Sequence, residues 1–487
     1  MALNILENFI KTKWNLLDNS FKNTLRNFLV NILIKSVTDN NFYSNQNNNF
    51  FINKLNIVII LIAKNEWTTT WQNFISELCE SSKNNENLCE NNMKLLQLLS
   101  EEINEFWKNS LTLQKAFELK EKMSHEFQQV FLLCNMIFDN SKSVKGSLLV
   151  TAVQLFAEYI VWFPIDLVFN QKIIDRFFDN LTSMNFIRND IIKCFGKIFE
   201  YNLEKINNNE DLFKIKQMTM NIYKTFIDIM IEITKGMNFA ERHKTIDPSM
   251  QSGLEKLILN FENTLTSFFK NNFFFIEQYD FISGSQTPNE FISIYLNNIA
   301  KGLEYLTQCH LIQNDEIFKA ACDFWYWFTY KIVFIKYPNL DPDREIPPQI
   351  NEEKIDNYVI YTNEMFLYKQ LYVNYIDIIR NQIIIRMNKP LEVKIDIDEN
   401  GDLTTDPTTN TIYQSLHDSM KETLVLLTNL DPYKTEKFLE DKIKELMELS
   451  KPLDINLLNS VSWSAGCISG SMNETLEKKF VVLIIRL

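Results

Sequence analysis

A short acidic stretch of the chain could bind a metal ion through oxygen atoms. Four residues follow the spacing of the first half of an EF-hand calcium loop: Asp396, Asp398, Asn400 and Gly401. The twelfth position of such a loop normally carries a bidentate glutamate, and here it is Pro407. Strand-like alternation also precedes this stretch, where an EF-hand has its entering helix. The sequence therefore predicts no metal site.

Catalytic side chains are equally hard to assemble from the sequence. The four histidines are scattered, with no HExxH spacing and no obvious serine or cysteine companion: His125, His243, His310 and His417. Residues 466–470 (GCISG) resemble a nucleophile elbow, but the serine is displaced by one position and no strand precedes it. Phosphate-cradling GxxxxGK and GxGxxG loops are absent from the sequence. We therefore predict that the chain is not an enzyme and needs no cofactor.

Three aromatic residues, Trp67, Trp71 and Phe74, could anchor a partner, because aromatic side chains dominate many interfaces. Their spacings of four and three residues place them on one face of a helix. Packing in the core is the commoner role of such a face, and we predict it here.

Composition indicates an all-α protein that can bury a large core. The 487 residues are 46% hydrophobic, yet they include only 9 glycines and 11 prolines, fewer than turn-rich β folds require. Seven widely spaced cysteines include no CxxC pair: Cys79, Cys89, Cys134, Cys194, Cys309, Cys322 and Cys467. This number and spacing of cysteines predict buried, reduced thiols in an intracellular protein.

Charge and hydropathy restrict the partners. The formal net charge of −13 opposes binding to phosphate backbones and anionic lipid, so we expect no direct contact with nucleic acid. Apolar runs such as residues 56–63 (NIVIILIA) are about half the ~20 residues that a membrane-spanning helix needs. The first residues also lack the pattern of a secretory leader. We expect a soluble protein that is neither secreted nor in a membrane.

Apolar residues recur with the 3.6-residue period of α-helices along most of the chain. The helical segments predicted from this period include residues 93–107, 126–138, 148–163, 173–178, 191–201, 218–233, 254–269, 291–306, 317–335 and 358–385. They lie about 20 residues apart, so a helix pair recurs at roughly the 40–47 residues of HEAT and armadillo arrays. Asparagine clusters at residues 45–49, 84–87 and 207–209 separate the periodic segments, and we interpret them as loops.

One segment departs from the helical period. Apolar and charged residues alternate over residues 391–398, and Asn400-Gly401 follows, which is a strong type I′ turn signal. We predict a β-hairpin, within residues 391–412, inserted as a loop into an α-solenoid of HEAT repeats. Long loops in such arrays tend to carry function.

The chain resembles the exportin-1 family of nuclear export receptors, within the importin-β superfamily. The stretch that carries most of this resemblance is residues 64–107, beginning KNEWTTTWQNFISELCE. Further stretches match in the same order: residues 3–14 (LNILENFIKTKW), 419–431 (SMKETLVLLTNLD) and 462–472 (SWSAGCISGSM). The resemblance implies an array of HEAT repeats that binds the small GTPase Ran in its GTP form, leucine-rich export-signal cargo and nuclear pore proteins, while shuttling between nucleus and cytoplasm.

The resemblance also implies a division of the chain. Residues 1–38 would be a partial amino-terminal importin-β-like region, residues 51–205 and 206–388 HEAT repeats, 389–412 an acidic hairpin loop, and 413–487 further repeats. Four acidic residues of the loop become candidates for coupling Ran to cargo: Asp396, Asp398, Glu399 and Asp402. The alternative for these four is a solvated charge cluster on a turn.

By this resemblance the chain covers about the amino-terminal half of the family, and we expect the array to be incomplete at both ends. The family's cargo groove with its reactive cysteine would lie beyond Leu487. Apolar residues 480–487 (FVVLIIRL) form a face meant for a neighbouring repeat, which predicts aggregation or dependence on a partner. Two alternatives stay open: a nuclear import receptor of the same superfamily, and a HEAT scaffold such as a phosphatase regulatory subunit.

Overall fold

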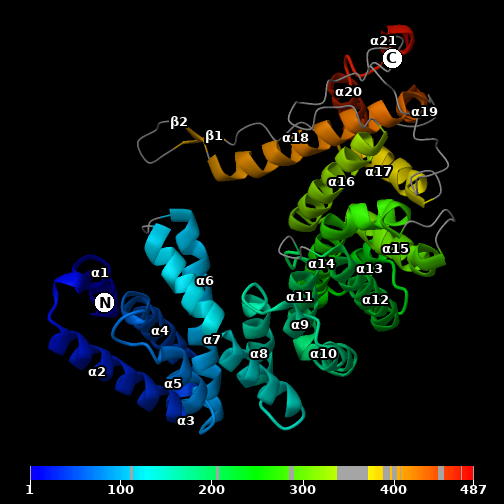
Figure 1. Cartoon of the computed structure of the whole chain (residues 1–487). Coiled ribbons are helices and arrows are strands. Elements are labelled where there is room, and N and C mark those ends of the chain that lie inside the picture. Colours follow the sequence, from blue (N-terminus) through cyan, green and yellow to red (C-terminus); the bar gives the residue numbers. More distant parts are fainter. Residues whose placement is uncertain are drawn as a thin grey trace. The chain divides into compact units, whose positions relative to one another are not determined.

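The computed structural model is helical over most of the residues that it describes (Figure 1). These are residues 2–109, 113–203, 208–283, 290–336, 371–387, 395–397, 403–405, 407–447, 454–472 and 474–485. The chain divides into two compact units, Met1–Ile229 and Met230–Leu487. The finer segment boundaries expected from the sequence remain predictions.

The first unit consists of short and long helices joined by tight turns. Its elements are α1 (Ala2–Lys13), η1 (Trp14–Leu16), α2 (Asn19–Thr38), α3 (Asn40–Tyr43), α4 (Gln46–Glu66), α5 (Phe74–Ser81), α6 (Glu86–Asn109), α7 (Leu113–Asp139), α8 (Gly146–Tyr159), α9 (Ile165–Val168), α10 (Gln171–Ser183), η2 (Asn185–Ile187) and α11 (Arg188–Phe199). Helix α12 (Asn209–Thr234) begins in this unit and ends in the next.

Helices of the first unit form two packed rows. Helices α4, α6, α8 and α11 contact one another in succession, and α5, α7 and α10 form the second row against them. Both α1 and α2 pack on α4. This two-row stacking of helix pairs is the α-solenoid arrangement predicted from the period of the apolar residues.

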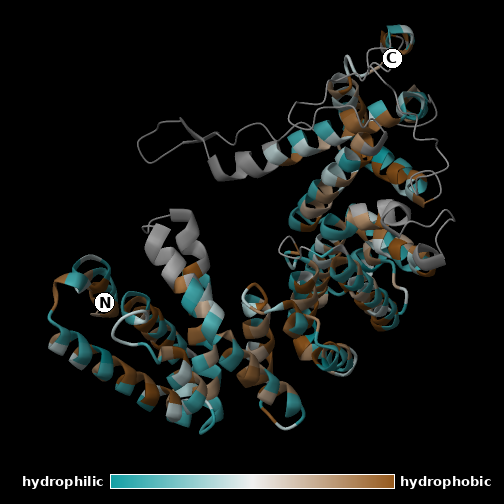
Figure 2. Cartoon of the chain, in the orientation of Figure 1, coloured by the Kyte–Doolittle hydropathy of each residue, from teal (hydrophilic) through white to brown (hydrophobic). Residues whose placement is uncertain are grey.

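Aromatic side chains fill the core of the first unit. Phe156 of α8 touches the rings of Phe138 and Phe177, with centroids 5.9 and 5.5 Å away. Phe195 of α11 extends this cluster by stacking on Phe178 at 4.8 Å. Figure 2 shows α8 as largely apolar, which fits its position between α6, α7 and α11. Such aromatic pairs stabilise by about 0.5–1.5 kcal/mol beyond their buried area.

The second unit repeats the two-row arrangement. Its helices are α13 (Phe239–Thr245), α14 (Pro248–Ser283), α15 (Glu290–Cys309), α16 (Asp315–Lys336), α17 (Val373–Arg386), α18 (Pro407–Leu430), α19 (Pro432–Met447), α20 (Ile455–Cys467) and α21 (Glu474–Ile485). Helices α14, α16, α18 and α20 pack in succession, and α13, α15, α17, α19 and α21 form the row beside them. Trp325 of α16 is fully buried in this core.

Two short strands precede α18. Strand β1 (Ile395–Ile397) pairs antiparallel with β2 (Leu403–Thr405), and Asp396 lies opposite Thr404. Both strands fall within residues 391–412, and α18 begins at Pro407, so the end of that range is helical. Proline suits the first turn of a helix, because the backbone N–H that it lacks would have no partner there.

Several predictions from the sequence are wrong in detail, and one of them is the loop at residues 84–87, because α6 already begins at Glu86. The asparagines at residues 47–49 lie inside α4, where the side chain of Asn45 caps the helix by accepting from Asn47 N, so this cluster begins a helix instead of forming a loop. The helix predicted over residues 148–163 ends at Tyr159, and Trp162 and Phe163 form a turn on its carbonyl. Pro164 explains the early end, because a residue before proline avoids helical geometry.

The cysteines agree with their prediction. All seven are free thiols, and all except the half-buried Cys467 are buried. Among the described residues, no helix is both long and apolar enough to span a bilayer.

Candidate functional site

The acidic hairpin is the candidate site named from the sequence. Asp396 is the middle residue of β1. Asp398, Glu399 and Asp402 lie outside the residues that the structure describes, so their role stays a prediction. The hairpin leads into α18, which packs against α16, α17, α19 and α20.

A buried ion cluster ties α17, α18 and α19 together near the carboxyl-terminal end of α18. The Arg380 guanidinium, fully buried, donates from Nη1 to Asp377 Oδ1 at 2.5 Å and from Nη2 to the Leu427 carbonyl at 3.1 Å. Lys434 of α19 pairs with the other oxygen of Asp377. Each of the three helices therefore contributes a polar group to one cluster, which fixes their mutual positions.

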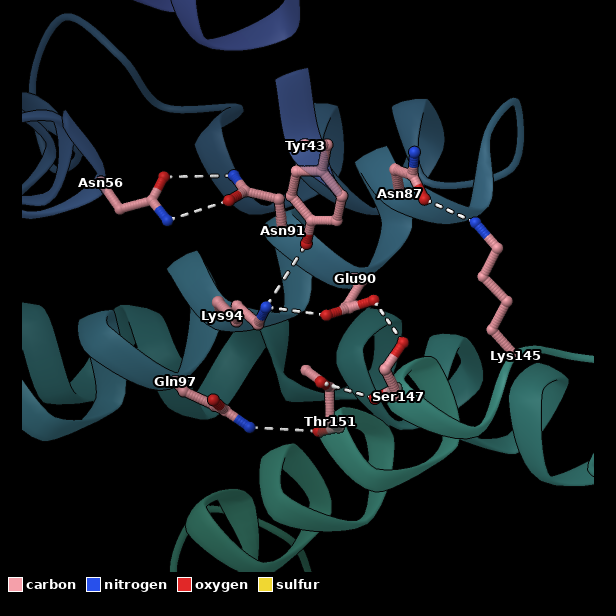
Figure 3. A network of polar contacts seen from close by, with 10 residues as sticks. All are labelled: Tyr43, Asn56, Asn87, Glu90, Asn91, Lys94, Gln97, Lys145, Ser147 and Thr151. Atoms are coloured by element: carbon pink, nitrogen blue, oxygen red, sulfur yellow. Dashed lines mark hydrogen bonds and ion pairs between the residues drawn. The ribbon is translucent and has the colours of Figure 1, made fainter. Parts of the chain in front are cut away.

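In the first unit, a chain of polar side chains runs along α6 and joins it to its neighbours (Figure 3). The buried amides of Asn56 and Asn91 bond reciprocally, at 2.9 and 3.1 Å. Glu90 accepts from Lys94 at 2.7 Å and from Ser147 of α8 at 2.9 Å.

The same chain of contacts extends to α3 and further along α8. Lys94 also lies 3.3 Å from the Tyr43 hydroxyl, and the Gln97 amide donates to the Thr151 carbonyl at 3.1 Å. Polar groups that satisfy one another in this way specify the register of packed helices. We therefore regard this row as a rigid scaffold and not as a reactive site.

The aromatic anchor residues lie in the core, as predicted, but not on one helix face, because α4 ends at Glu66 and α5 begins only at Phe74. Trp67 and Phe74 are almost fully buried and Trp71 is nearly so. Arg26 of α2 lies over the Trp71 ring, 5.0 Å from its centroid, and pairs with Glu66 at 2.8 Å. These rings hold α2, α4 and α5 together, and their burial leaves them no surface for recognising a partner.

Sequence reasoning missed one pairing of reactive residue types. His310 Nε2 lies 3.6 Å from the Cys322 sulfur, across the turn between α15 and α16. Burial, together with the nearby Arg386 charge, lowers the pKa of His310 to about 3, and burial raises the pKa of the Cys322 thiol far above its ordinary value. Both groups are therefore neutral and enclosed, whereas a catalytic pair needs a thiolate and access to substrate. The separation of 12 residues gave no warning of the contact.

The last motif that suggested catalysis, the sequence GCISG, belongs to a helix end and a turn. Residues 466–470 form the end of α20 and the turn after it, where Gly470 adopts a positive φ of 77°. A nucleophile elbow would require a strand before this turn. Over the described ranges, no group of three or more histidine, cysteine or acidic residues is arranged to hold a metal ion.

One buried carboxyl yields a testable pH dependence. Glu262 of α14 is fully buried, and neither carboxyl oxygen has a hydrogen-bond partner. Burial, and to a lesser extent the negative charge of Asp323 on α16, raises the pKa of Glu262 well above its ordinary value. The folded chain thus holds a proton that the unfolded chain releases at neutral pH, so stability falls as the pH rises above the ordinary carboxyl range.

We expect Glu262→Gln to remove this dependence, because the amide needs no proton in order to be buried. The free energy of unfolding should rise at pH 8 by about 1.4 kcal/mol for each unit by which burial raises the pKa. Urea unfolding from pH 5 to 9 measures the effect. The same change at the exposed Glu241 should leave the pH slope of the wild type, and an unchanged slope in Glu262→Gln would contradict the assignment.

Comparison with known proteins places these features in a family. A family model described as Exportin 1-like protein matches residues 48–195, and models of CRM1/exportin repeats 2 and 3 match residues 368–435 and 451–487. The second of these matches includes the hairpin and α18. Three separate models thus match the chain in order.

Curated relatives match along the entire chain. Exportin-1 of Drosophila melanogaster is 28% identical over 488 residues, and exportin-1 of Schizosaccharomyces pombe is 29% identical over 493 residues. Each alignment covers 100% of this chain but only 41% and 42% of the relative, so the chain spans about two fifths of their length.

A solved structure supports the fold independently of sequence. Importin-13 in its cytosolic state superposes with a TM-score of 0.56 at 12% identity, over 91% of this chain and 46% of that one. At that identity the likeness bears on the fold alone, and it agrees with the two rows of helices described above. The ordered family matches, the alignments along the whole of this chain and this helical-repeat fold together place the chain in the exportin-1 family.

Proposed function

We propose that this chain is part of a nuclear export receptor that binds Ran in its GTP-bound state and shuttles between nucleus and cytoplasm. The observation that carries the proposal is the alignment of the whole chain with exportin-1 proteins. The complete receptor would carry leucine-rich export-signal cargo and contact nuclear pore proteins, with no direct contact to nucleic acid or membrane. Higher affinity for GTP-bound than for GDP-bound Ran would favour loading in the nucleus and release in the cytoplasm.

The hairpin is the proposed coupling element within this function. Asp396, Asp398, Glu399 and Asp402 concentrate negative charge on one short segment, joined at Pro407 to a helix packed against four others. Coupling between two ligands requires an element whose position both ligands bias. An acidic hairpin could supply such an element, because basic surfaces of Ran or of cargo would attract it.

Binding of the chain to Ran in its two nucleotide states tests the proposal. We expect tighter binding to Ran loaded with a non-hydrolysable GTP analogue than to Ran-GDP, by a factor within the roughly 5–150-fold range of measured couplings. Changing the four acidic hairpin residues to their amides should reduce this preference. Isothermal titration calorimetry with the full chain measures both affinities.

A matched control shows whether the position of the neutralised carboxylates matters, or only the change in net charge of the chain. The same fourfold neutralisation at exposed carboxylates far along the sequence, Glu80, Glu210, Asp211 and Glu241, should preserve the preference for GTP. A hairpin variant that behaves like this control would mean that the four acids are only a solvated cluster. Equal binding to both nucleotide states, or no binding, would argue against export and in favour of a HEAT scaffold.

A further inference from the structure

An exposed serine lies at the contact between α6 and α8. Ser147 is the second residue of α8, and it is exposed to solvent. Its hydroxyl donates to Glu90 Oε2 of α6 at 2.9 Å, as Figure 3 shows. Glu90 itself is buried, with only 7% of the residue exposed. A single hydroxyl proton at the surface therefore helps to satisfy a buried carboxylate of the neighbouring helix.

The charge of Glu90 is already matched by another side chain. Its other carboxylate oxygen accepts from the Lys94 ammonium at 2.7 Å, and the two form an ion pair. Ser147 brings a hydrogen bond to this pair but no charge. A negative group in place of the serine proton would remove the donor and would also be repelled by the carboxylate.

The segment before Ser147 is basic and exposed. Exposed lysines occupy the second and fifth positions before the serine, Lys145 and Lys142, and most of the turn at residues 139–145 is exposed as well. Protein kinases select their serines partly by such charge patterns. Residues 148–149 are buried leucines, so a kinase reaches the serine when the first turn of α8 opens. No side chain caps this helix start, which favours such opening.

We propose that Ser147 is a phosphorylation site and that its modification loosens the contact between α6 and α8. A protein kinase would transfer the γ-phosphoryl group of a nucleoside triphosphate to Ser147 Oγ. The O–H bond breaks and a P–O bond forms, the nucleoside diphosphate leaves, and the hydroxyl proton passes to a base of the kinase. The donor to Glu90 is then lost, and a group with about two negative charges takes its place.

The phosphate would leave α8 helical while it weakens two contacts with α6. Negative charge in the first turn of a helix is favoured by the helix dipole, so α8 itself is not destabilised. The Lys145 ammonium now donates to Asn87 Oδ1 of α6 at 2.7 Å, and a phosphate two residues away would attract it. The bonds from the start of α8 to Glu90 and to Asn87 would therefore be lost together.

Treatment of the full chain with the catalytic subunit of cyclic-AMP-dependent protein kinase tests whether the site is reached, because this kinase selects serines that follow basic residues. We expect mass spectrometry to find phosphate on Ser147, and Ser147→Ala to abolish that modification. A chain that takes up no phosphate, or takes it up only at other residues, would contradict the assignment of the site.

A chain that carries genetically encoded phosphoserine at position 147 tests the structural consequence. Amides of α6 around Glu90 should exchange with solvent about tenfold faster than in the wild type, as expected when a hydrogen bond to a charged group is lost. Phosphoserine in place of Ser143 is the matched control. It puts the same charge on the same turn, but the Ser143 hydroxyl donates to the Asn140 carbonyl at 3.0 Å and not to Glu90, so exchange in α6 should stay as in the wild type. Circular dichroism checks that every variant is folded.

Glu90→Gln distinguishes charge repulsion from a general disturbance of the helix. The amide that it introduces can donate to a phosphate oxygen, so adding phosphoserine at position 147 to Glu90→Gln should not speed exchange further. Equal acceleration with and without Glu90→Gln would show that repulsion by the carboxylate is not the cause. Unchanged exchange in the phosphorylated chain, or the same acceleration from phosphoserine at position 143, would also overturn the proposal.

Discussion

Replacing Trp67 by alanine is expected to lower the free energy of unfolding by about 3–5 kcal/mol, the range for loss of a large buried aromatic side chain. Trp67 is fully buried where α4 ends. The Lys122 ammonium of α7 lies 5.3 Å from its ring centroid and donates to the Trp67 carbonyl at 2.6 Å. Removing the ring leaves a cavity and also strips this cation of its aromatic cover.

Urea unfolding measures the loss of unfolding free energy, and hydrogen exchange shows which helices are destabilised. The amides of α4, α5 and α7 should exchange faster, because Trp67 lies where these helices meet, while the second unit should exchange as in the wild type. Leu132→Ala, an exposed position on the same helix as Lys122, should stay within about 0.5 kcal/mol of the wild type. If Trp67→Ala lowers the free energy of unfolding by less than about 1 kcal/mol, the result contradicts a core role for Trp67.

The periodic segments show how much of the fold can be predicted from sequence. Residues 93–107 fall inside α6, and residues 126–138 inside α7, because broad apolar faces leave little freedom in where a helix forms. The core role predicted for Trp67, Trp71 and Phe74 is also found, although a turn between α4 and α5 stands where their spacing predicted one helix. Patterns of this kind are local, so they can be recognised within a short stretch of chain.

Local rules that compete with one another explain the errors. Asparagine favours both loops and helix N-termini, and composition alone could not show that Asn45 caps α4 while the next asparagines continue as helix. In the helix predicted over residues 148–163, apolar periodicity continued past the point at which Pro164 stops the helix.

Contacts between repeats could not be predicted, because nothing in the sequence links their members. His310 and Cys322 meet only because α15 and α16 pack side by side. The Arg380 side chain reaches a carbonyl 47 residues away. For the hairpin, alternation at residues 391–398 pointed to the part of the chain where β1 and β2 lie, but its role depends on surroundings that an isolated segment does not contain.

The cluster around Arg380 is the second site where a single change should have a large effect. Asp377→Ala is expected to lower the free energy of unfolding by about 3–5 kcal/mol, because it leaves a fully buried guanidinium without its carboxylate. Arginine keeps its charge in proteins, so the cluster cannot relax by losing a proton. Only the Leu427 carbonyl would remain as a partner for Arg380 among the contacts of the described residues.

Lys434→Met is the matched control, since it removes the other cation that pairs with Asp377. The Lys434 side chain is partly exposed, so its loss should cost no more than about 1 kcal/mol. Urea unfolding of both variants, with hydrogen exchange over α17, α18 and α19, separates the two effects. Equal losses would mean that the carboxylate acts mainly through Lys434. A larger loss for Asp377→Ala would show that the buried Arg380 pair is the main tie between α17 and the carboxyl-terminal part of α18.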